Sequence, residues 1–188
     1  MRQAGSRRPR IAGSHAAFTR RAPRLRLSWS EGDATLSSEL RYRRATAAEL
    51  GAIVALLADD ALGAARETAS ESLSDRYRDA FSEIDADPNQ FLCVVEDGRR
   101  IVGTLQLSFI PGLSREGARR GQIEAVRIAR DRRGAKLGEA MLAWAIRECR
   151  ARGCALVQLT TDKARPDAHR FYERLGFAPS HIGYKLKL

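Results

Sequence analysis

The chain has 188 residues, of which 44% are hydrophobic, and it carries a formal net charge of +10. This length suits one domain with a real core and argues against a second full domain. No apolar run approaches the roughly 20 residues that cross a bilayer, and the N-terminus lacks the apolar stretch of a secretory signal. We therefore expect a cytoplasmic protein that has no membrane partner.

The positive charge is concentrated near the N-terminus. Residues 1–40 contain eight arginines and three acidic residues, so they carry a net +5, half of the total. Their Arg, Ala and Ser content, with little periodic hydrophobicity, is typical of a disordered extension. An organelle transit peptide and a nucleic-acid-binding arm are the open alternatives. Because acidic residues are interspersed through 41–188, we predict a domain over that range that does not bind nucleic acid.

Cysteine and histidine residues do not form a metal-binding pattern. The three cysteines contain no Cys-x-x-Cys pair, and the three histidines are scattered along the chain; these residues are Cys93, Cys149, Cys154, His15, His169 and His181. Zinc sites need clustered ligands of these types. We therefore expect reduced thiols and no metal.

The first part of the domain predicts one strand and two helices. The stretch 40–46 alternates as a strand does, and Thr46 with Glu49 three residues later has the spacing of a helix capping box. A second helix is predicted over 74–84, where apolar residues recur at intervals of three and four.

A β-hairpin is predicted over 91–110. Two apolar, β-branched runs flank Asp97-Gly98, a dipeptide that tolerates the positive φ of tight turns. The Gly- and Arg-rich residues 111–120 are expected to form a loop.

The remaining chain alternates between strands and helices. Strand character over 122–129 is followed by a helix over 136–152, a buried strand over 155–161 and a helix over 167–175, and 177–188 is predicted to be a pair of strands. The order β-α-α-β-β-β-α-β-α-β indicates an α/β sandwich in which a hairpin precedes a βαβ unit.

The stretch DRRGAKLGEAML (131–142) joins a strand to a helix through two glycines and several basic residues. A helix N-terminus exposes about four amide groups without partners and attracts anions. The spacing matches neither GxGxxG nor the P-loop, so an ordinary capped helix is an open alternative to a phosphate site.

Three segments in order resemble the GNAT superfamily of acetyl-CoA-dependent N-acetyltransferases: AVRIARDRRGAKLGEAMLAWAI, ALVQLTT and AHRFYERLGF. The resemblance covers residues 41 to the end. It implies a GNAT-like α/β fold with a mixed, splayed central sheet flanked by helices. It also implies that acetyl-CoA is the co-substrate, and that its diphosphate and pantetheine contact Arg133, Gly134, Ala135, Lys136, Gly138, Val126 and Ile128.

Two positions depart from the family pattern. Lys136 replaces a glycine of the loop. If the backbone at this position has φ > 0, a lysine there costs on the order of 1 kcal/mol in strain. Arg165 stands where relatives often have asparagine. The contacts that the asparagine makes with the pantetheine or substrate are therefore not assigned to Arg165.

The resemblance assigns Tyr172 as the acid that protonates the leaving thiolate, and a core role is its alternative. Glu124 is the candidate base, because by period two it shares a face with Val126 and Ile128 and some relatives have a glutamate there; an ion pair with a nearby arginine is the alternative. His181 is the second candidate base, since histidine titrates near neutral pH.

The predicted reaction is direct transfer of the acetyl group to a primary amine of a small molecule or peptide in a ternary complex. Cys149 and Cys154 are expected to pack in the core rather than to attack the thioester. A CoA-sensing module without catalysis is the alternative function, and edge strands permit a homodimer.

Overall fold

The computed structural model describes residues 40–188 except 60, 65 and 68–72. The predicted N-terminal extension therefore lies, except for its last residue, outside the described residues. Across the described part of the chain, no helix is both long and apolar enough to cross a membrane. The elements in chain order are β1 (Arg41–Arg44), the 3₁₀ turn η1 (Ala47–Glu49), α1 (Leu50–Ala58), α2 (Ala61–Ala64), α3 (Asp75–Ala86), β2 (Gln90–Asp97), β3 (Arg100–Ile110), α4 (Ser114–Gly117), β4 (Arg120–Ile128), the 3₁₀ turn η2 (Arg130–Arg132), α5 (Leu137–Ala151), β5 (Leu156–Leu159) and α6 (Pro166–Arg174).

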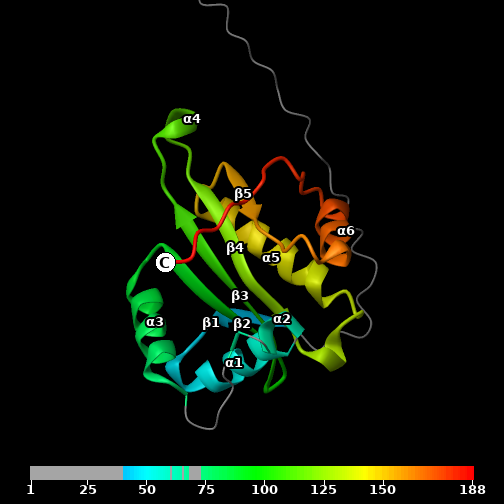
Figure 1. Ribbon diagram of the computed structural model, residues 1–188. Helices are drawn as coiled ribbons and strands as arrows, with labels where there is room; N and C mark the ends of the chain where they lie inside the picture. The colour runs from blue at the N-terminus through cyan, green and yellow to red at the C-terminus, as the bar shows by residue number, and fades with distance from the viewer. Residues whose placement is uncertain (1–39, 60, 65, 68–72) are drawn as a thin grey trace, which may run out of the picture. The chain divides into compact units, whose positions relative to one another are not determined.

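The sheet has five strands in the order β1-β2-β3-β4-β5. The first four are antiparallel neighbours, and β5 pairs parallel to β4 after the α5 crossover. This mixed sheet with helices on both faces confirms the predicted α/β class (Figure 1). The predicted hairpin is β2-β3, in which Asp97 pairs with Arg100 and Gly98 adopts φ +62° in the turn.

Each face of the sheet has its own apolar core. On one face α5 packs through a stripe of buried residues spaced three and four apart: Leu137, Met141, Leu142, Ala145 and Cys149. On the other face α1 and α3 cover β2, and the buried residues are Ala45, Leu50, Ile53, Phe81, Leu92 and Val94. The two faces can therefore be told apart by which cluster a side chain joins.

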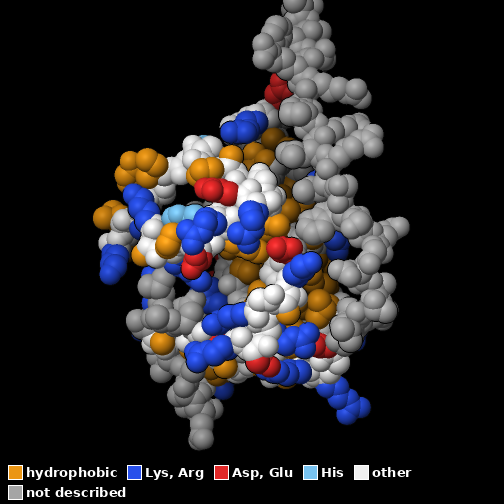
Figure 2. Space-filling view, turned by 90° about the vertical axis from the view of Figure 1, so that its right-hand side faces the viewer, with side chains coloured by type: hydrophobic (Ala, Val, Ile, Leu, Met, Phe, Trp, Pro, Cys, Tyr) orange, Lys and Arg blue, Asp and Glu red, His pale blue; other side chains and the backbone are white. Residues whose placement is uncertain are grey.

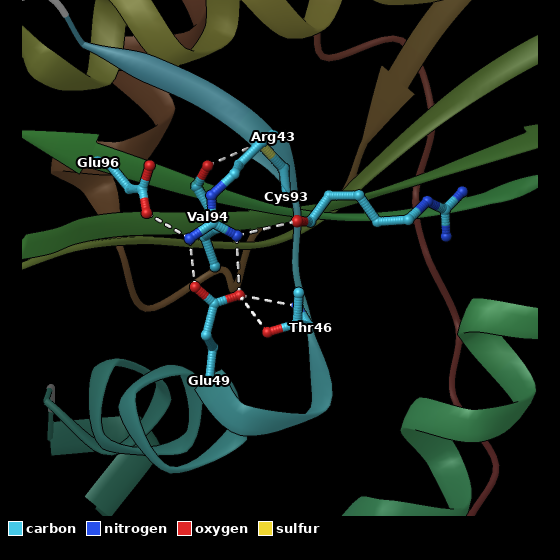
Figure 3. A network of polar contacts seen from close by, with 7 residues as sticks. Arg43, Thr46, Glu49, Cys93, Val94 and Glu96 are labelled. Atoms are coloured by element: carbon cyan, nitrogen blue, oxygen red, sulfur yellow. Dashed lines mark hydrogen bonds and ion pairs between the residues drawn. The ribbon is translucent and has the colours of Figure 1, made fainter. Parts of the chain in front are cut away.

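The predicted capping box at the start of the first helix is confirmed, and it is part of a larger network (Figure 3). The Glu49 carboxylate accepts hydrogen bonds from the Thr46 amide at 2.7 Å and the Thr46 hydroxyl at 3.0 Å. Arg43 on β1 donates to the same carboxylate at 2.9 Å and also pairs with Glu96 on β2. The network lowers the pKa of Glu49 to about 2, chiefly through the hydrogen bond from Arg43.

The predicted strand pair over 177–188 is wrong. This segment contains no strand, and every side chain from 178 to 188 is exposed. Apolar residues do alternate there, which suits a strand, but a strand also needs a neighbouring strand to satisfy its backbone groups. Among the described residues none supplies one.

Candidate active site

Strands β4 and β5, the last two strands of the sheet, separate along their length. They pair only from Arg120↔Leu156 to Ile123↔Leu159, and the last five residues of β4 pair with β3 alone among the described residues. Beyond Ile123, one side of β4 is thus available for main-chain contacts with a ligand. The splay expected of the sheet is present.

A β-bulge interrupts β4 where the splay begins. Ala125 and Val126 together face the single residue Leu105, and Ala125 has φ +52°. A bulge breaks the period-two alternation of side chains. Residues on either side of Ala125 therefore do not occupy the faces that simple alternation predicts.

The bulge places Glu124 on the face opposite Val126 and Ile128, so the prediction that the three share a face is wrong. Val126 and Ile128 pack against the α5 core. Glu124 instead pairs in register with Gln106. Gln106 and Ala125 both line a cavity of about 100 Å³ beneath α1 and α3.

Glu124 is exposed, and it forms no hydrogen bond or ion pair with any residue that the structure describes. The alternative in which Glu124 is neutralised by a neighbouring arginine thus finds no support in the described contacts. His181, the second candidate base, lies in the exposed C-terminal segment, where its Nδ1 is 2.8 Å from the Ser180 hydroxyl.

The turn between β4 and α5 has the backbone of an anion-binding loop. Gly134 has φ +82° and Lys136 has φ +57°, both in the left-handed region. The first helical bond of α5 runs from the Ala140 amide to the Lys136 carbonyl, so the amides of residues 134–139 have no acceptor among the described residues. Residues 133–136 are exposed, which leaves the amides of 134–136 accessible to a phosphate.

Ion pairs hold this turn from two sides. Asp59, the C-cap of α1, binds Arg130 at 2.9 Å and Arg133 at 3.0 Å. On the other side Asp131 accepts a hydrogen bond from Arg100 of the β2-β3 hairpin at 2.8 Å, and Arg132 pairs with Asp97 of the same hairpin. The turn is therefore positioned by residues distant in sequence.

The Arg133 side chain points away from the exposed amides. Its Nε donates to the Ile128 carbonyl at 3.1 Å, and its guanidinium also donates to the Asp59 carbonyl at 2.9 Å. The Arg133 amide is also engaged, because it donates to the Arg130 carbonyl at 3.3 Å, so Arg133 holds the turn in place.

Helix α6 approaches the same turn through Phe171. A Cβ on Gly138 would lie 3.2 Å from Phe171 Cζ and 3.2 Å from Ile128 Cδ1, so only a glycine allows this close packing without a shift. Tyr172 follows Phe171 and contacts it edge to face at 5.3 Å between ring centroids. The structure thus brings together Gly138 of the loop, Ile128 of β4 and the Tyr172 region of α6.

The Tyr172 hydroxyl has no hydrogen-bond partner among the described residues, although its ring is half-buried. Burial raises the pKa of Tyr172 above its ordinary value, while the charges of Arg165 and Arg127 act in the opposite direction. A phenol kept protonated near two cations can give up a proton and is stabilised as the anion that results. These properties suit a general acid.

The cysteines are packed rather than reactive. Cys149 is fully buried against Gly121, and burial raises the pKa of its thiol to about 12. Burial also raises the pKa of Cys154. A thiol is a nucleophile as the thiolate, so these groups are poor candidates for a covalent acetyl-enzyme. Within the described ranges, no group of three or more His, Cys, Asp or Glu side chains could hold a metal ion.

The site combines a splayed strand pair, a bulge where the splay begins and a turn before α5 with unpaired amides. These features suggest a binding site for a CoA thioester, and comparison with known families supports that assignment. Residues 56–177 match the model of the acetyltransferase (GNAT) family. The chain belongs to the GNAT family. It is accordingly an acetyl-CoA-dependent N-acetyltransferase.

Two curated GNAT relatives share one third or more of their residues with this chain in the aligned regions. An aminoalkylphosphonate N-acetyltransferase from Salmonella typhimurium is 34% identical over 57% of this chain and 70% of the relative. A glucosamine 6-phosphate N-acetyltransferase from Trypanosoma brucei brucei is 39% identical over 47% of this chain and 58% of the relative.

A solved structure with the same fold is a protein described as a transcriptional regulator from Bacillus halodurans C-125. It is 46% identical to this chain, with a TM-score of 0.77 over 80% of this chain and all of the other. The fold expected from the GNAT resemblance is thereby confirmed.

Three residues that hold or charge the site were not predicted from the sequence to do so: Asp59, Arg127 and Arg165. Asp59 is 74 residues from Arg133, and no local spacing connects the two. Arg127 lies between Val126 and Ile128, and in an alternating strand such a charged residue is expected to face solvent. Arg165 was noted only as a departure from the family pattern, whereas the structure places its charge near Tyr172.

Proposed function

We propose that this GNAT enzyme transfers an acetyl group directly from acetyl-CoA to the primary amine of a small molecule that carries an anionic phosphorus group. The single observation that carries the proposal is the turn at 134–138, whose amides have no protein acceptor among the described residues, beside the edge of β4 that splays away from β5. The two features give a diphosphate and a pantetheine arm adjoining places to bind.

On the donor side, the main chain does most of the binding. The amides of Gly134, Ala135, Lys136 and Gly138 face the diphosphate, where the N-terminal dipole of α5 adds attraction for negative charge, and Arg133 holds the start of the turn in place. The edge of β4 at Val126 and Ile128 then pairs with the pantetheine amides as a strand would. This arrangement fixes the thioester beside the bulge at Ala125.

On the acceptor side, Glu124 removes the proton from the amine. A lysine-like amine with a pKa of about 10.4 is neutral in only about one molecule in two thousand at pH 7, so a base has a large effect, typically ~10²- to 10⁴-fold. Glu124 fits because the bulge turns it toward the α1 and α3 face, where Gln106 and Ala125 line the cavity. The amine then attacks from that face while the donor lies along the strand edge.

Tyr172 donates the proton that the leaving thiolate needs. It comes from α6, on the α5 side of the sheet, so acid and base act from opposite faces across the splay. The amine nitrogen forms the new amide bond, the thioester C–S bond breaks, and CoA leaves as the free thiol. Neither the buried Cys149 nor Cys154 takes part, which fits transfer within a ternary complex.

The acceptor class is supported by the two curated relatives, whose names specify an aminoalkylphosphonate and glucosamine 6-phosphate. Arg127 and Arg165, whose charges act on Tyr172 at the reacting centre, are the cations that we expect to attract such a group. A peptide amine, which lacks the phosphorus group, is the acceptor with which such a small molecule is to be compared.

The test is release of free CoA thiol from acetyl-CoA with purified full-length chain and a panel of amines. Aminoethylphosphonate and glucosamine 6-phosphate should accelerate release, and matched amines without phosphorus, ethylamine and glucosamine, should do so at least about tenfold less well at equal concentration. Equal rates with and without the phosphorus group would refute the acceptor class. Binding of acetyl-CoA without release for any amine, peptides included, would favour the alternative of a CoA-sensing module.

A further inference from the structure

A hydrogen-bond network fixes the orientation of the Gln106 side chain on β3. Its Nε2 donates to Gln90 Oε1 on β2 at 3.1 Å, and the same oxygen accepts a hydrogen bond from the Ser108 hydroxyl at 2.8 Å. The amide nitrogen and the carbonyl oxygen of a glutamine lie on opposite sides of its terminal carbon. Because β3 lies between β2 and β4, a nitrogen directed toward β2 leaves Gln106 Oε1 on the side of β4.

The Glu124 carboxylate lies on the same side of Gln106. The two residues are directly opposite in the register of β3 and β4, and side chains opposite each other in an antiparallel pair share a face with Cβ atoms about 5 Å apart. A carbonyl oxygen and an ionised carboxylate both only accept hydrogen bonds. Neither Gln106 Oε1 nor the Glu124 carboxylate receives a hydrogen bond from a residue that the structure describes. The pair therefore forms two adjacent acceptors that lack a donor within the described part of the chain.

The cavity beside these two acceptors has two hydroxyls in its wall, and both are engaged elsewhere. Tyr77 donates to Glu67 at 2.7 Å, and Thr104 donates to the Cys93 carbonyl at 2.8 Å. Apart from Gln106, the other side chains that line the cavity are apolar. A ligand that satisfies both acceptors must therefore bring its own donors, and a primary ammonium, which has three N–H groups on one atom, suits the pair best.

We propose that Gln106 Oε1 and the Glu124 carboxylate together bind the amine of the acceptor as its ammonium ion, and that Gln106 selects amines over alcohols. This inference rests on the proposed transfer to an amine with Glu124 as the base. The ammonium donates one N–H to each of the two acceptors. One proton then passes from nitrogen to Glu124, and the neutral amine keeps its hydrogen bond to Gln106 while its free electron pair attacks the thioester carbon. Gln90 and Ser108 are positioning residues, because they hold the Gln106 amide with its oxygen toward the amine.

The charge of the surrounding surface fits this assignment. Lys and Arg side chains gather on the face of the molecule that carries α6, as Figure 2 shows. Such a face attracts an anionic group and repels an ammonium. The two acceptors on the side of α1 and α3 therefore hold the amine end of the substrate, and the basic residues attract its anionic end.

Calorimetry of the full chain with CoA bound tests the proposal with aminoethylphosphonate and its alcohol counterpart, hydroxyethylphosphonate. Gln106→Leu should weaken binding of the amine about tenfold or more, because a charge-assisted hydrogen bond is lost, and should weaken binding of the alcohol about threefold at most. Gln158→Leu breaks a similar amide pair, with Gln122 at 2.7 Å, and should bind both ligands as the wild type does. Equal weakening for amine and alcohol, or equal effects of the two variants, would overturn the proposal.

Ethylamine distinguishes this inference from the acceptor class proposed above. If the phosphorus group is not recognised, the wild type should bind ethylamine as well as aminoethylphosphonate, and Gln106→Leu should still weaken ethylamine binding about tenfold. If Gln106→Leu weakens the binding of neither amine, or if the wild type binds neither, the inference fails whatever the acceptor class.

Variants of Gln90 test the positioning role. Gln90→Leu removes the oxygen that holds the Gln106 amide, so amine binding should weaken about threefold to tenfold. Gln90→Glu keeps an oxygen that accepts both hydrogen bonds and should restore amine binding to near the wild-type value. Wild-type amine binding by Gln90→Leu, or equal losses with leucine and glutamate, would show that the network does not orient Gln106.

Discussion

Arg133 and Asp59 form an ion pair at 3.0 Å that links the turn before α5 to the end of α1. The same carboxylate binds Arg130, and the Arg133 guanidinium also donates to the Asp59 carbonyl. A single residue of the first helix thereby fixes two arginines of the loop that we assign to the diphosphate. Because α1 lines the cavity next to Glu124, this contact also joins the donor and acceptor sides of the site.

Replacing Asp59 with alanine should raise the KM for acetyl-CoA about tenfold and change kcat little, because the turn loses its anchor while the reacting groups stay in place. With S-acetylpantetheine, which lacks the diphosphate, KM should stay near the wild-type value. Asp85→Ala, which removes an exposed partner of Arg44, is the control. Equal losses with both donors would contradict the assignment, as would tighter binding of acetyl-CoA to the Asp59 variant.

Lys136→Gly should tighten acetyl-CoA binding about fivefold, as measured by calorimetry. Lys136 has φ +57°, ψ +6° at the N-cap of α5, a conformation that costs a residue with a Cβ about 1 kcal/mol and costs glycine little. Lys136→Gln keeps the strained backbone and removes the charge, so it should not tighten binding. If the glycine variant binds acetyl-CoA as weakly as the glutamine variant, strain at this position is not what limits affinity.

Tyr172→Phe should lower kcat by about 10²-fold and leave the Kd for acetyl-CoA nearly unchanged, since the ring packing survives and the proton donor is lost. Because burial raises the pKa of Tyr172 above its ordinary value, any decline of kcat through loss of this proton should set in at a higher pH than for an exposed tyrosine. Tyr42→Phe, where the ring stacks on Trp144, is the control. Full turnover by Tyr172→Phe would remove this residue from the mechanism.

Glu124→Gln should lower kcat/KM by about 10²-fold at pH 7, and the loss should shrink as the pH approaches the pKa of the amine. At that pH the acceptor is neutral without help, so a base contributes less. An acceptor whose amine has a pKa below 7 should show only a small difference between wild type and variant at neutral pH. A loss that stays constant across pH and across amines would point to a structural role for Glu124.

The network of Arg43, Glu49 and Glu96 should make stability sensitive to acid. The pKa of Glu49 is about 2 in the folded chain, below its ordinary 4.5, so its contribution is present above about pH 4.5 and is lost as the pH falls toward 2. Glu49→Gln should reduce the free energy of unfolding by about 1–3 kcal/mol at pH 7, with the difference from wild type shrinking toward pH 2. Urea unfolding at several pH values measures this. Asp85→Asn, in a more exposed pair, should cost about 0–1 kcal/mol, and a Glu49 variant with no larger effect would show that the network adds little.

The five strands with α1, α3, α5 and α6, the hairpin turn at Gly98 and the capping box at Thr46 and Glu49 followed from the sequence, because each depends on residues close together in the chain, whereas the short helices α2 and α4 and the end of the chain did not. The sequence raised a positive φ at Lys136 only as a condition, and the structure shows that the condition holds, with φ +57°. The family motifs also located the loop and Tyr172 within the chain.

Only the tertiary structure decided which face Glu124 occupies, what holds Arg133 and what becomes of residues 182–188. The bulge at Ala125 arises from pairing with β3 and overrides the alternation that the sequence of β4 suggests. The Asp59 contact joins residues 74 positions apart, and such a pairing depends on how α1 packs on the sheet. A strand is completed by its neighbour, so alternating residues at the C-terminus could indicate the capacity to pair but not whether a partner strand lies within reach.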